Sequence, residues 1–326
     1  MNRRDTLMEF PRSSLHDGAM TADRTGGFTD INRQHWSLRY LPPWARPYGR
    51  LARWDRPIGT WLLLLPCWWS LALGAAPQWD RLAGWMALFA LGALAMRGAG
   101  CTWNDIVDRK VDAQVERTRG RPLPSGEVTL RNALIWMVLQ SLVGAAILFK
   151  LNKFAGGVAL ASLILVAIYP TMKRYTSWPQ FVLGLAFNWG ALVGYATVTG
   201  MLSWATLALY AGGVAWTMVY DTIYAMQDQR DDAVIGVRST ARRFADAPRR
   251  WLTLFALLAL AAWALAGHLA GLGLNYFAIL LAIALHLAWQ IAFLKPNDQA
   301  DCLAKFKANA WIGALLTAAI IASHLG

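Results

Sequence analysis

Nine apolar runs, most of them close to twenty residues long, decide what this chain can fold into. A helix needs about 20 apolar residues to cross the roughly 30 Å hydrocarbon core of a bilayer. The runs cover residues 57–76, 79–102, 130–149, 154–170, 178–199, 203–222, 251–270, 275–294 and 309–325. Arg81 and Arg97 interrupt the second run, and the fourth is short before Pro170, so the count depends most on these two. The sequence therefore predicts an all-α membrane protein with about nine transmembrane helices.

The composition excludes an ordinary soluble enzyme. Of the 326 residues 56% are hydrophobic and 15% are charged, whereas soluble domains carry roughly 25% charged residues. The net charge of +12 does not indicate nucleic acid, because the basic residues lie between runs of membrane length rather than on solvated faces. Cys67, Cys101 and Cys302 are far apart and have neither disulfide-framework nor zinc-site spacing. Nothing in the sequence points to a protein partner.

The basic residues predict which ends of the helices lie together. Of the 31 Lys and Arg residues, 27 fall in residues 1–56, 103–131, 171–177, 223–250 and 295–308. With nine spans these five segments all lie on one side, which the positive-inside rule assigns to the cytoplasm.

Two regions of the chain are predicted. Residues 1–50 are polar and Arg-rich, without the apolar core of a secretory signal, and are expected to form a disordered cytosolic tail. Residues 51–326 form the membrane domain. A weakly amphipathic stretch from Trp36 to Trp54 is expected to lie on the membrane surface before the first span.

The first of two acidic loops begins where the second run ends. Asp105, Asp108 and Asp112 follow one another at steps of three and four residues, so a helix continuing past Trp103 places their carboxylates on one face. Asn104 precedes this row.

The second acidic loop begins where the sixth run ends. Asp221, Asp228 and Asp232 are separated by seven and four residues, steps that again select one helical face, with Tyr224 between them. Like charges at such spacing destabilise a helix by a few tenths of a kcal/mol per pair, so a compensating cation is expected. Carboxylate oxygens are the ligands of Mg²⁺, which keeps further positions for water and phosphate. Two such clusters on one side favour a divalent-metal site over solvated loop acids.

Cations beside these acids suit a phosphorylated substrate. Arg117, Arg121, Lys173, Arg174 and Arg238 can clamp phosphate oxygens. Lys173 and Arg174 belong to a loop of only a few residues, so they must lie close to the membrane mouth of the bundle. A metal held by acids at a membrane surface, with cations nearby, predicts a site for a phosphorylated lipid.

Two polar residues lie inside predicted spans. Arg97 costs at least about 2.5 kcal/mol near the middle of a span, so it is expected to face a polar cavity beneath the first acidic cluster. Asn188 lies beside Gly184, Gly190 and Gly194, where helices can pack closely. A role in binding substrate and an interhelical hydrogen bond are equally compatible with Asn188.

The acidic motifs resemble the two signatures of the UbiA superfamily of intramembrane prenyltransferases. The matching stretches are Asn104-Asp105-x-x-Asp108-x-x-x-Asp112, Tyr220-Asp221-x-x-Tyr224-Ala225-x-x-Asp228-x-x-x-Asp232 and Arg117-Thr-x-x-Arg121-Pro-Leu-Pro-Ser-Gly126. Asp55-Arg56-Pro57-Ile58-Gly59-Thr60, Tyr169-Pro-x-x-Lys173-Arg174-x-Thr176 and Phe187-Asn188-Trp189-Gly190 look like the branch that prenylates 4-hydroxybenzoate. The resemblance runs from about Leu51 to the C-terminus.

The resemblance implies a bundle of nine transmembrane helices around a central cavity, capped on the cytoplasmic side by two Asp-rich loops. It implies Mg²⁺-dependent transfer of a polyprenyl group from its diphosphate to 4-hydroxybenzoate, for ubiquinone synthesis in a bacterial or mitochondrial inner membrane. Asp108, Asp112, Asp228 and Asp232 are expected to hold the metal, with Lys173 assisting catalysis. The remaining predicted substrate-binding residues are Asn104, Asp105, Arg117, Arg121, Asp221, Tyr224, Asn188 and the candidates for the acceptor carboxylate, Arg174, Arg56 and Arg97, in that order.

Three other functions share some of these sequence features. Another aromatic or quinone-precursor acceptor fits the same motifs. A divalent-cation transporter is disfavoured, because transporter sites lie near the bilayer midplane and these acids lie at span ends. A CDP-alcohol phosphotransferase also uses aspartates and Mg²⁺, but its compact glycine-interspersed signature is not found here.

Overall fold

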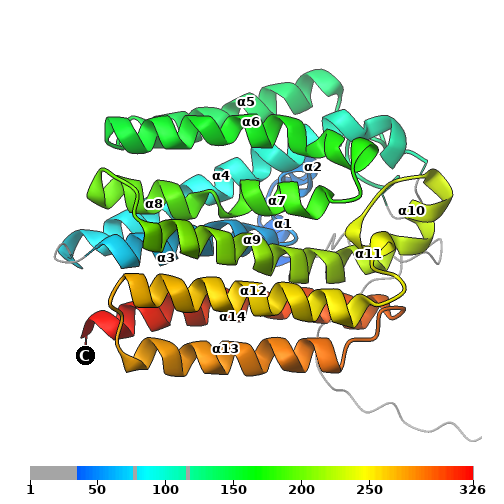
Figure 1. Cartoon of the computed structure of the whole chain (residues 1–326). Coiled ribbons are helices and arrows are strands. Elements are labelled where there is room, and N and C mark those ends of the chain that lie inside the picture. The colour runs from blue at the N-terminus through cyan, green and yellow to red at the C-terminus, as the bar shows by residue number, and fades with distance from the viewer. Residues whose placement is uncertain (1–34, 76–78, 115–117, 326) are drawn as a thin grey trace, which may run out of the picture.

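The computed structural model describes residues 35–75, 79–114 and 118–325, and the regular structure in these ranges is helical. The helices run side by side in layers (Figure 1). They are α1 (Trp36–Arg39), η1 (Pro43–Ala45), α2 (Arg46–Leu51), α3 (Ile58–Gly74), α4 (Trp79–Asp112), α5 (Leu130–Leu148), α6 (Lys153–Tyr175), α7 (Pro179–Asn188), α8 (Gly190–Thr199), α9 (Trp204–Ala225), η2 (Met226–Asp228), α10 (Gln229–Ile235), α11 (Thr240–Arg243), α12 (Pro248–Leu269), α13 (Leu274–Ala292) and α14 (Gln299–Leu325).

Every predicted apolar run coincides with helical structure, the fifth with the pair α7 and α8. In the described part of the chain, seven helices are both long and apolar enough to cross a membrane: α4, α5, α6, the pair α7–α8, α12, α13 and α14. The helix α3 is shorter, at 17 residues, and the 22-residue α9 is not among the seven. The all-α membrane architecture is confirmed, and the count of nine spans stays a prediction.

Short polar side chains and prolines fix where the helices begin. Asn152 accepts the amide of Ala155 at 2.9 Å to cap α6, and Ser203 accepts the amide of Thr206 at 3.2 Å to cap α9. Pro179 and Pro248 occupy the first turn of α7 and α12, where the missing N–H costs nothing. These signals set the first residues of α6, α7, α9 and α12.

Glycines of α8 allow it to lie directly against α3. A Cβ at Gly190 would come within 2.3 Å of Cys67 Sγ, and one at Gly194 within 2.7 Å of the Cys67 carbonyl oxygen. Lipid tails are as apolar as the helices, so close packing of this kind, rather than exclusion of water, holds membrane helices together.

The described parts of the five basic segments lie toward the end of the bundle that carries α10 and α11, on the right of Figure 1. The amide of Arg238 donates to the carbonyl of Lys173 at 3.1 Å, which joins two of the segments. Arg50 pairs with Glu127, and Gln299 Nε2 donates to the Gln227 carbonyl at 2.9 Å. We call this region the basic end. Its assembly agrees with the predicted grouping of the basic segments.

The described part of the predicted tail is helical. Leu38 and Leu51 are buried, whereas Trp36, Tyr40 and Trp44 are exposed, so α1, η1 and α2 present aromatic side chains outward, as the amphipathic pattern predicts. Residues 1–34 lie outside the described ranges, and the domain boundary at residue 51 stays a prediction.

The prediction that Asp221, Asp228 and Asp232 share one face of a continuous helix is wrong. The helix α9 ends at Ala225, a 3₁₀ turn covers Met226–Asp228, and α10 follows. Gln227 lies at this break, where its side-chain amide donates to the Tyr224 carbonyl at 3.0 Å and its own carbonyl accepts from Gln299. The carbonyls that would continue the helical ladder are therefore used by side chains.

The grouping at the basic end predicts one accessible face for two distant loops. Single cysteines at Ser125 and Asp246 should react with an impermeant maleimide added to the same side of a sealed membrane, because both positions are exposed at the basic end. A cysteine at Met201, which lies between α8 and α9 at the other end, should react only from the opposite side. Labelling of positions 125 and 246 from opposite sides would contradict the fold.

Candidate active site

A cavity of about 800 Å³ opens inside the bundle between α3, α4, α5, α6, α7, α8, α9 and α14. Its wall has two chemical characters. The part near the basic end is polar, because it is built from the residues before α3, the last turns of α4, α6 and α9, and the first turns of α14. Its polar residues are His35, Arg53, Asp55, Arg56, Arg97, Asn104, Arg121, Tyr169, Asp221, Tyr224 and Lys307.

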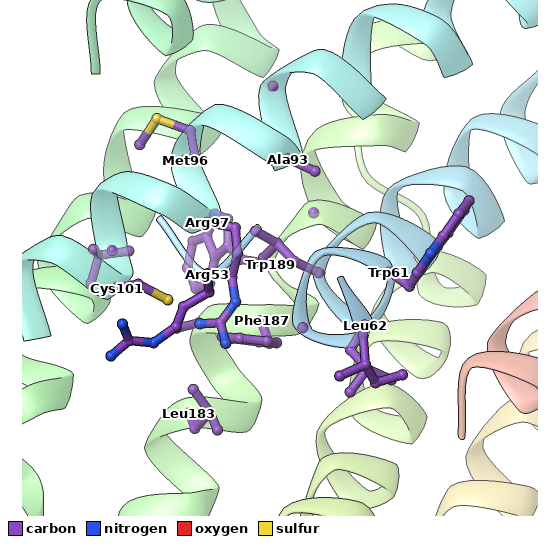
Figure 2. Close-up of a pocket in the computed structure, with 18 of the residues that line it drawn as sticks. Arg53, Trp61, Leu62, Ala93, Met96, Arg97, Cys101, Leu183, Phe187 and Trp189 are labelled. Atoms are coloured by element: carbon purple, nitrogen blue, oxygen red, sulfur yellow. The ribbon is translucent and has the colours of Figure 1, made fainter. Parts of the chain in front are cut away.

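The rest of the cavity wall is apolar and aromatic. It comes from the middle turns of α3 and α4, the end of α5 and the facing parts of α6, α7 and α8. Figure 2 shows Arg53 and Arg97 beside such side chains, among them Met96, Leu183, Phe187 and Trp189. A polar chamber therefore continues into an apolar one without leaving the cavity.

Three carboxylates of α4 form a buried row beside the polar chamber. The helix continues to Asp112, and Asp105, Asp108 and Asp112 are all buried, which confirms that they share one face. Arg53 Nη2 lies 2.5 Å and Arg121 Nη1 3.2 Å from Asp105 Oδ1, and Arg121 Nη1 lies 2.7 Å from Asp112 Oδ2. An unpaired buried carboxylate is costly, so these arginines are required for the row to stay buried.

Asp108 is held by the last turn of α6, so the prediction that Lys173 and Arg174 belong to a short loop is wrong. Lys173 Nζ lies 2.6 Å from Asp108 Oδ2, and Arg174 Nη2 lies 3.2 Å from Oδ1. The Asp108 side chain is fully buried, whereas that of Arg174 is 45% exposed. Both cations therefore lie between a buried carboxylate and the surface, where an arriving anion can compete for them.

Arg53 holds Asp105 from a strained backbone. Its φ of 61° makes it the only non-glycine residue with positive φ in the described ranges. Such a conformation costs of order 1–3 kcal/mol and persists where surrounding contacts fix it. Arg53 Nη1 donates to the Arg50 carbonyl at 3.0 Å while Nη2 pairs with Asp105. The segment before α3 is thereby fixed to the acidic row of α4.

Arg97 lines the polar chamber, as the cost of a charge within a span predicts. Its guanidinium lies over the Phe187 ring at 5.2 Å and against Gly59, where a Cβ would come within 2.5 Å of Arg97 Nη2. It also interacts electrostatically with Asp221. Its Nε is buried without a hydrogen-bond partner in the described part of the protein. Arg97 thus lines the same chamber as Asp221 and retains one unused donor.

Asn188 makes an interhelical hydrogen bond. Its Nδ2 donates to Thr217 Oγ1 of α9 and to the Gly184 carbonyl, both at 2.8 Å, and the residue is buried. Among the described residues it is not one of those lining the cavity, whereas its neighbours Phe187 and Trp189 are. Of the two interpretations left open for Asn188, the structure supports packing.

The chemistry of the donors fits a hard divalent cation, although the ligands are not gathered. Within residues 35–75, 79–114 and 118–325, no three carboxylate, histidine or cysteine side chains come close enough to hold one ion. Asp228 lies at the end of η2 and Asp232 in α10. Asp105 Oδ2, in contrast, is buried and accepts no hydrogen bond from the described residues. A buried, unused carboxylate oxygen beside Asp108 is what a bound cation would satisfy.

The structure brings together part of the predicted site. Asn104, Arg121, Arg56, Arg97, Asp221 and Tyr224 line the cavity, and Asp105, Asp108, Asp112, Lys173 and Arg174 form the ion pairs beside it. Arg117 lies outside the described residues.

Sequence reasoning missed Arg53, Asp55, Tyr169 and Lys307 as cavity residues. Asp55 and Tyr169 lie in stretches noted for the resemblance and could have been found there. Arg53 is one of several basic residues before the first span, and nothing in the sequence distinguishes it from the others. Lys307 precedes the last apolar run, and no motif surrounds it.

Comparison with known proteins gives a consistent result. The model of the UbiA prenyltransferase family matches residues 63–313. The chain is 46% identical over 292 residues to the mitochondrial 4-hydroxybenzoate polyprenyltransferase of Arabidopsis thaliana, covering 89% of this chain and 72% of that protein. It is 44% identical over 316 residues to the Drosophila melanogaster protein of the same name, covering 96% and 80%.

Solved structures share the fold. A UbiA homologue from Aeropyrum pernix K1 in its apo form has a TM-score of 0.64 at 24% identity, covering 82% of this chain and 98% of that one. A UbiA homologue from Archaeoglobus fulgidus bound to DMAPP and Mg²⁺ has a TM-score of 0.64 at 20% identity, covering 85% and 98%.

Proposed function

Since the chain belongs to the UbiA prenyltransferase family, we propose that it transfers a polyprenyl group from polyprenyl diphosphate to the carbon ortho to the hydroxyl of 4-hydroxybenzoate. The observation that carries this proposal is the similarity, at 44–46% identity over most of the chain, to relatives named for that reaction. The product belongs to ubiquinone biosynthesis.

The diphosphate of the donor is proposed to bind at the basic end, beside the acidic row of α4. Lys173 and Arg174 lie on Asp108 in the present structure, and an arriving diphosphate offers them a stronger anion. Their transfer to phosphate oxygens frees Asp108. Arg121, which bridges Asp105 and Asp112 and also lines the cavity, is the next cation within the chamber.

Asp108, Asp112, Asp228 and Asp232 are the proposed ligands of Mg²⁺. The ion, when bound, neutralises negative charge that develops on the diphosphate as the carbon–oxygen bond breaks. Support comes from the carboxylate chemistry of both motifs. The buried, unused oxygen of Asp105 belongs to the same row of α4 but to none of these four side chains. The A. fulgidus homologue is described with Mg²⁺, and its low identity to this chain makes the parallel one of fold alone.

The apolar chamber suits the prenyl group and its reaction. Loss of diphosphate leaves an allylic cation that water would capture, so the walls of α3, α4 and α8 are proposed to exclude water. The faces of Tyr169, Phe187 and Tyr224 line the same cavity and can stabilise a cation. The ring carbon then forms the new carbon–carbon bond and loses its proton.

Arg97 is the proposed partner of the acceptor carboxylate. A benzoate entering an apolar cavity needs a charged donor to offset its desolvation, and the planar guanidinium matches a carboxylate. The sequence ranked Arg174 first, but Arg174 is half-exposed and bonded to Asp108, and Arg56 donates to Asp55 at 3.2 Å. Arg97 lies within the cavity with an unused Nε–H. The geometry therefore favours Arg97 over both.

The chain is an integral membrane protein, and we place it in an inner membrane, bacterial or mitochondrial, with the basic end facing the cytoplasm or its equivalent. The mitochondrial names of the relatives support the location. The concentration of positive charge at one end supports the orientation.

Replacement of either motif's aspartate should slow prenyl transfer. Asp108→Asn and Asp228→Asn each remove a charged ligand while keeping the side-chain shape, so kcat/KM should fall by at least about tenfold, equivalent to about 1.4 kcal/mol. Asp80→Asn is the matched control, because Asp80 lies at the opposite end of α4 with a 77% exposed side chain. Thermal stability in detergent should be recorded for each variant. Near-normal turnover of both Asp108→Asn and Asp228→Asn would eliminate the metal assignment.

Arginine-to-lysine exchanges should separate the two substrates. Arg97→Lys keeps the charge but loses the planar fork, so the KM for 4-hydroxybenzoate should rise about tenfold with little change in the KM for prenyl diphosphate. Arg174→Lys should show the reverse selectivity. If Arg97→Lys affects only the KM for prenyl diphosphate, the acceptor carboxylate is held elsewhere.

A further inference from the structure

A second groove lies outside the cavity described above, between the segment before α3 and the first half of α5. Its volume is about 440 Å³, and it is lined by Trp44, Ala45, Tyr48, Gly49, Trp54, Asn132, Ile135, Trp136 and Leu139. The ring centroids of Trp54 and Trp136 are 6.0 Å apart, and those of Tyr48 and Trp136 are 5.8 Å apart. The groove is therefore aromatic and carries no charged residue in its lining as far as the described residues go.

Two indole N–H groups in this lining are unsatisfied. Trp54 Nε1 and Trp136 Nε1 are each buried and have no hydrogen-bond partner among the residues that the structure describes. Buried tryptophan N–H groups normally find an acceptor, and a lost hydrogen bond of this kind is costly. Both donors belong to side chains that line one apolar groove, so an occupant that carries acceptors but no charge at that depth would satisfy them.

The position of the groove along α5 indicates how deep in the membrane its occupant lies. Asn132–Leu139 are the third to tenth residues of α5, so they lie within about 15 Å of the helix start at the basic end. Ile135 and Leu139 are about half exposed, and only 11% of the apolar window of α5 is buried, so this helix faces lipid. Trp44 is exposed at the rim. Tryptophans at this level are typical of the membrane interface.

The rim of the groove is basic. Arg46 follows the lining residue Ala45, and Arg131 precedes Asn132 and lies one helical turn before Ile135, on the same face of α5. Both arginines are exposed. The nearby Glu127 is already paired with Arg50. Unlike the interior of the groove, the rim is suited to an anionic headgroup.

We propose that this groove binds an anionic glycerophospholipid. Its ester carbonyls accept hydrogen bonds from Trp54 Nε1 and Trp136 Nε1, its phosphate lies at Arg46 and Arg131, and an acyl chain follows Ile135 and Leu139. In such a lipid the ester carbonyls lie between the charged headgroup and the apolar acyl chains. The groove offers groups that match these parts in the same order, with arginines at the rim, then indole N–H groups, then apolar side chains. The proposal is independent of the prenyl-transfer reaction.

Native mass spectrometry of the full-length protein tests the proposal. Delipidated protein is titrated with phosphatidylglycerol or phosphatidylcholine, and the affinity of the first bound lipid is measured. The double variant Trp54→Phe/Trp136→Phe keeps both rings but removes both N–H donors, so phosphatidylglycerol should bind about tenfold more weakly than to the wild type. Trp289→Phe, which removes an indole near the end of α13, is the matched control and should bind normally.

A second variant keeps the test decisive if the double variant folds poorly. Ala45→Trp fills the groove from its lining and leaves both indoles in place, so it should also abolish the tight phosphatidylglycerol site. Unchanged affinity in Ala45→Trp and in the double variant would overturn the proposal. Equal binding of phosphatidylcholine and phosphatidylglycerol by the wild type would overturn the anionic assignment, since Arg46 and Arg131 would then contribute nothing.

Discussion

The burial of three carboxylates on one face of α4 is the constraint on which the rest of the structure depends. Asp105, Asp108 and Asp112 lie at the end of a membrane helix, where charge without compensation is prohibitive. Their compensation comes from three separate places in the sequence: Arg53 before α3, Arg121 after α4, and Lys173 with Arg174 in the last turn of α6. The ion pairs therefore hold these three parts of the chain against the end of α4 and build the polar end of the cavity.

The cavity combines two environments that prenyl transfer needs to keep adjacent. Cations and carboxylates gather where the helices end, whereas the walls deeper in the bundle are apolar, since each helix contributes its terminal turn to one part and its middle turns to the other. Arg97 lies between them. Its guanidinium lies over the Phe187 ring and fills the space that Gly59 leaves open because it has no side chain. Trp54 belongs to the segment that lines this cavity through Arg53, Asp55 and Arg56 and also forms the second groove.

The sequence pattern predicted correctly those features that depend on the geometry of a single helix. Run length gave the membrane helices, and the three- and four-residue steps of Asp105, Asp108 and Asp112 gave their common face because α4 is a regular helix to its end. The same counting did not work for Asp228 and Asp232, because α9 ends at Ala225 and a 3₁₀ turn follows, where the Gln227 carbonyl accepts from Gln299, 72 residues away. Whether Arg97 or Arg174 is the better candidate for the acceptor carboxylate depends on the burial and the partners of each side chain, which residue spacing does not reveal. Spacing also does not reveal the positive φ of Arg53, whose side chain pairs with the distant Asp105.

A structure of the full-length protein with Mg²⁺ and a non-hydrolysable prenyl thiolodiphosphate tests the central claim, that the cations on Asp108 are held in place for the diphosphate. The account predicts that Lys173 Nζ and the Arg174 guanidinium leave Asp108 and bind phosphate oxygens, with Asp108 and Asp228 on the metal. A diphosphate bound away from α4 and η2, with Lys173 still paired to Asp108, would contradict it.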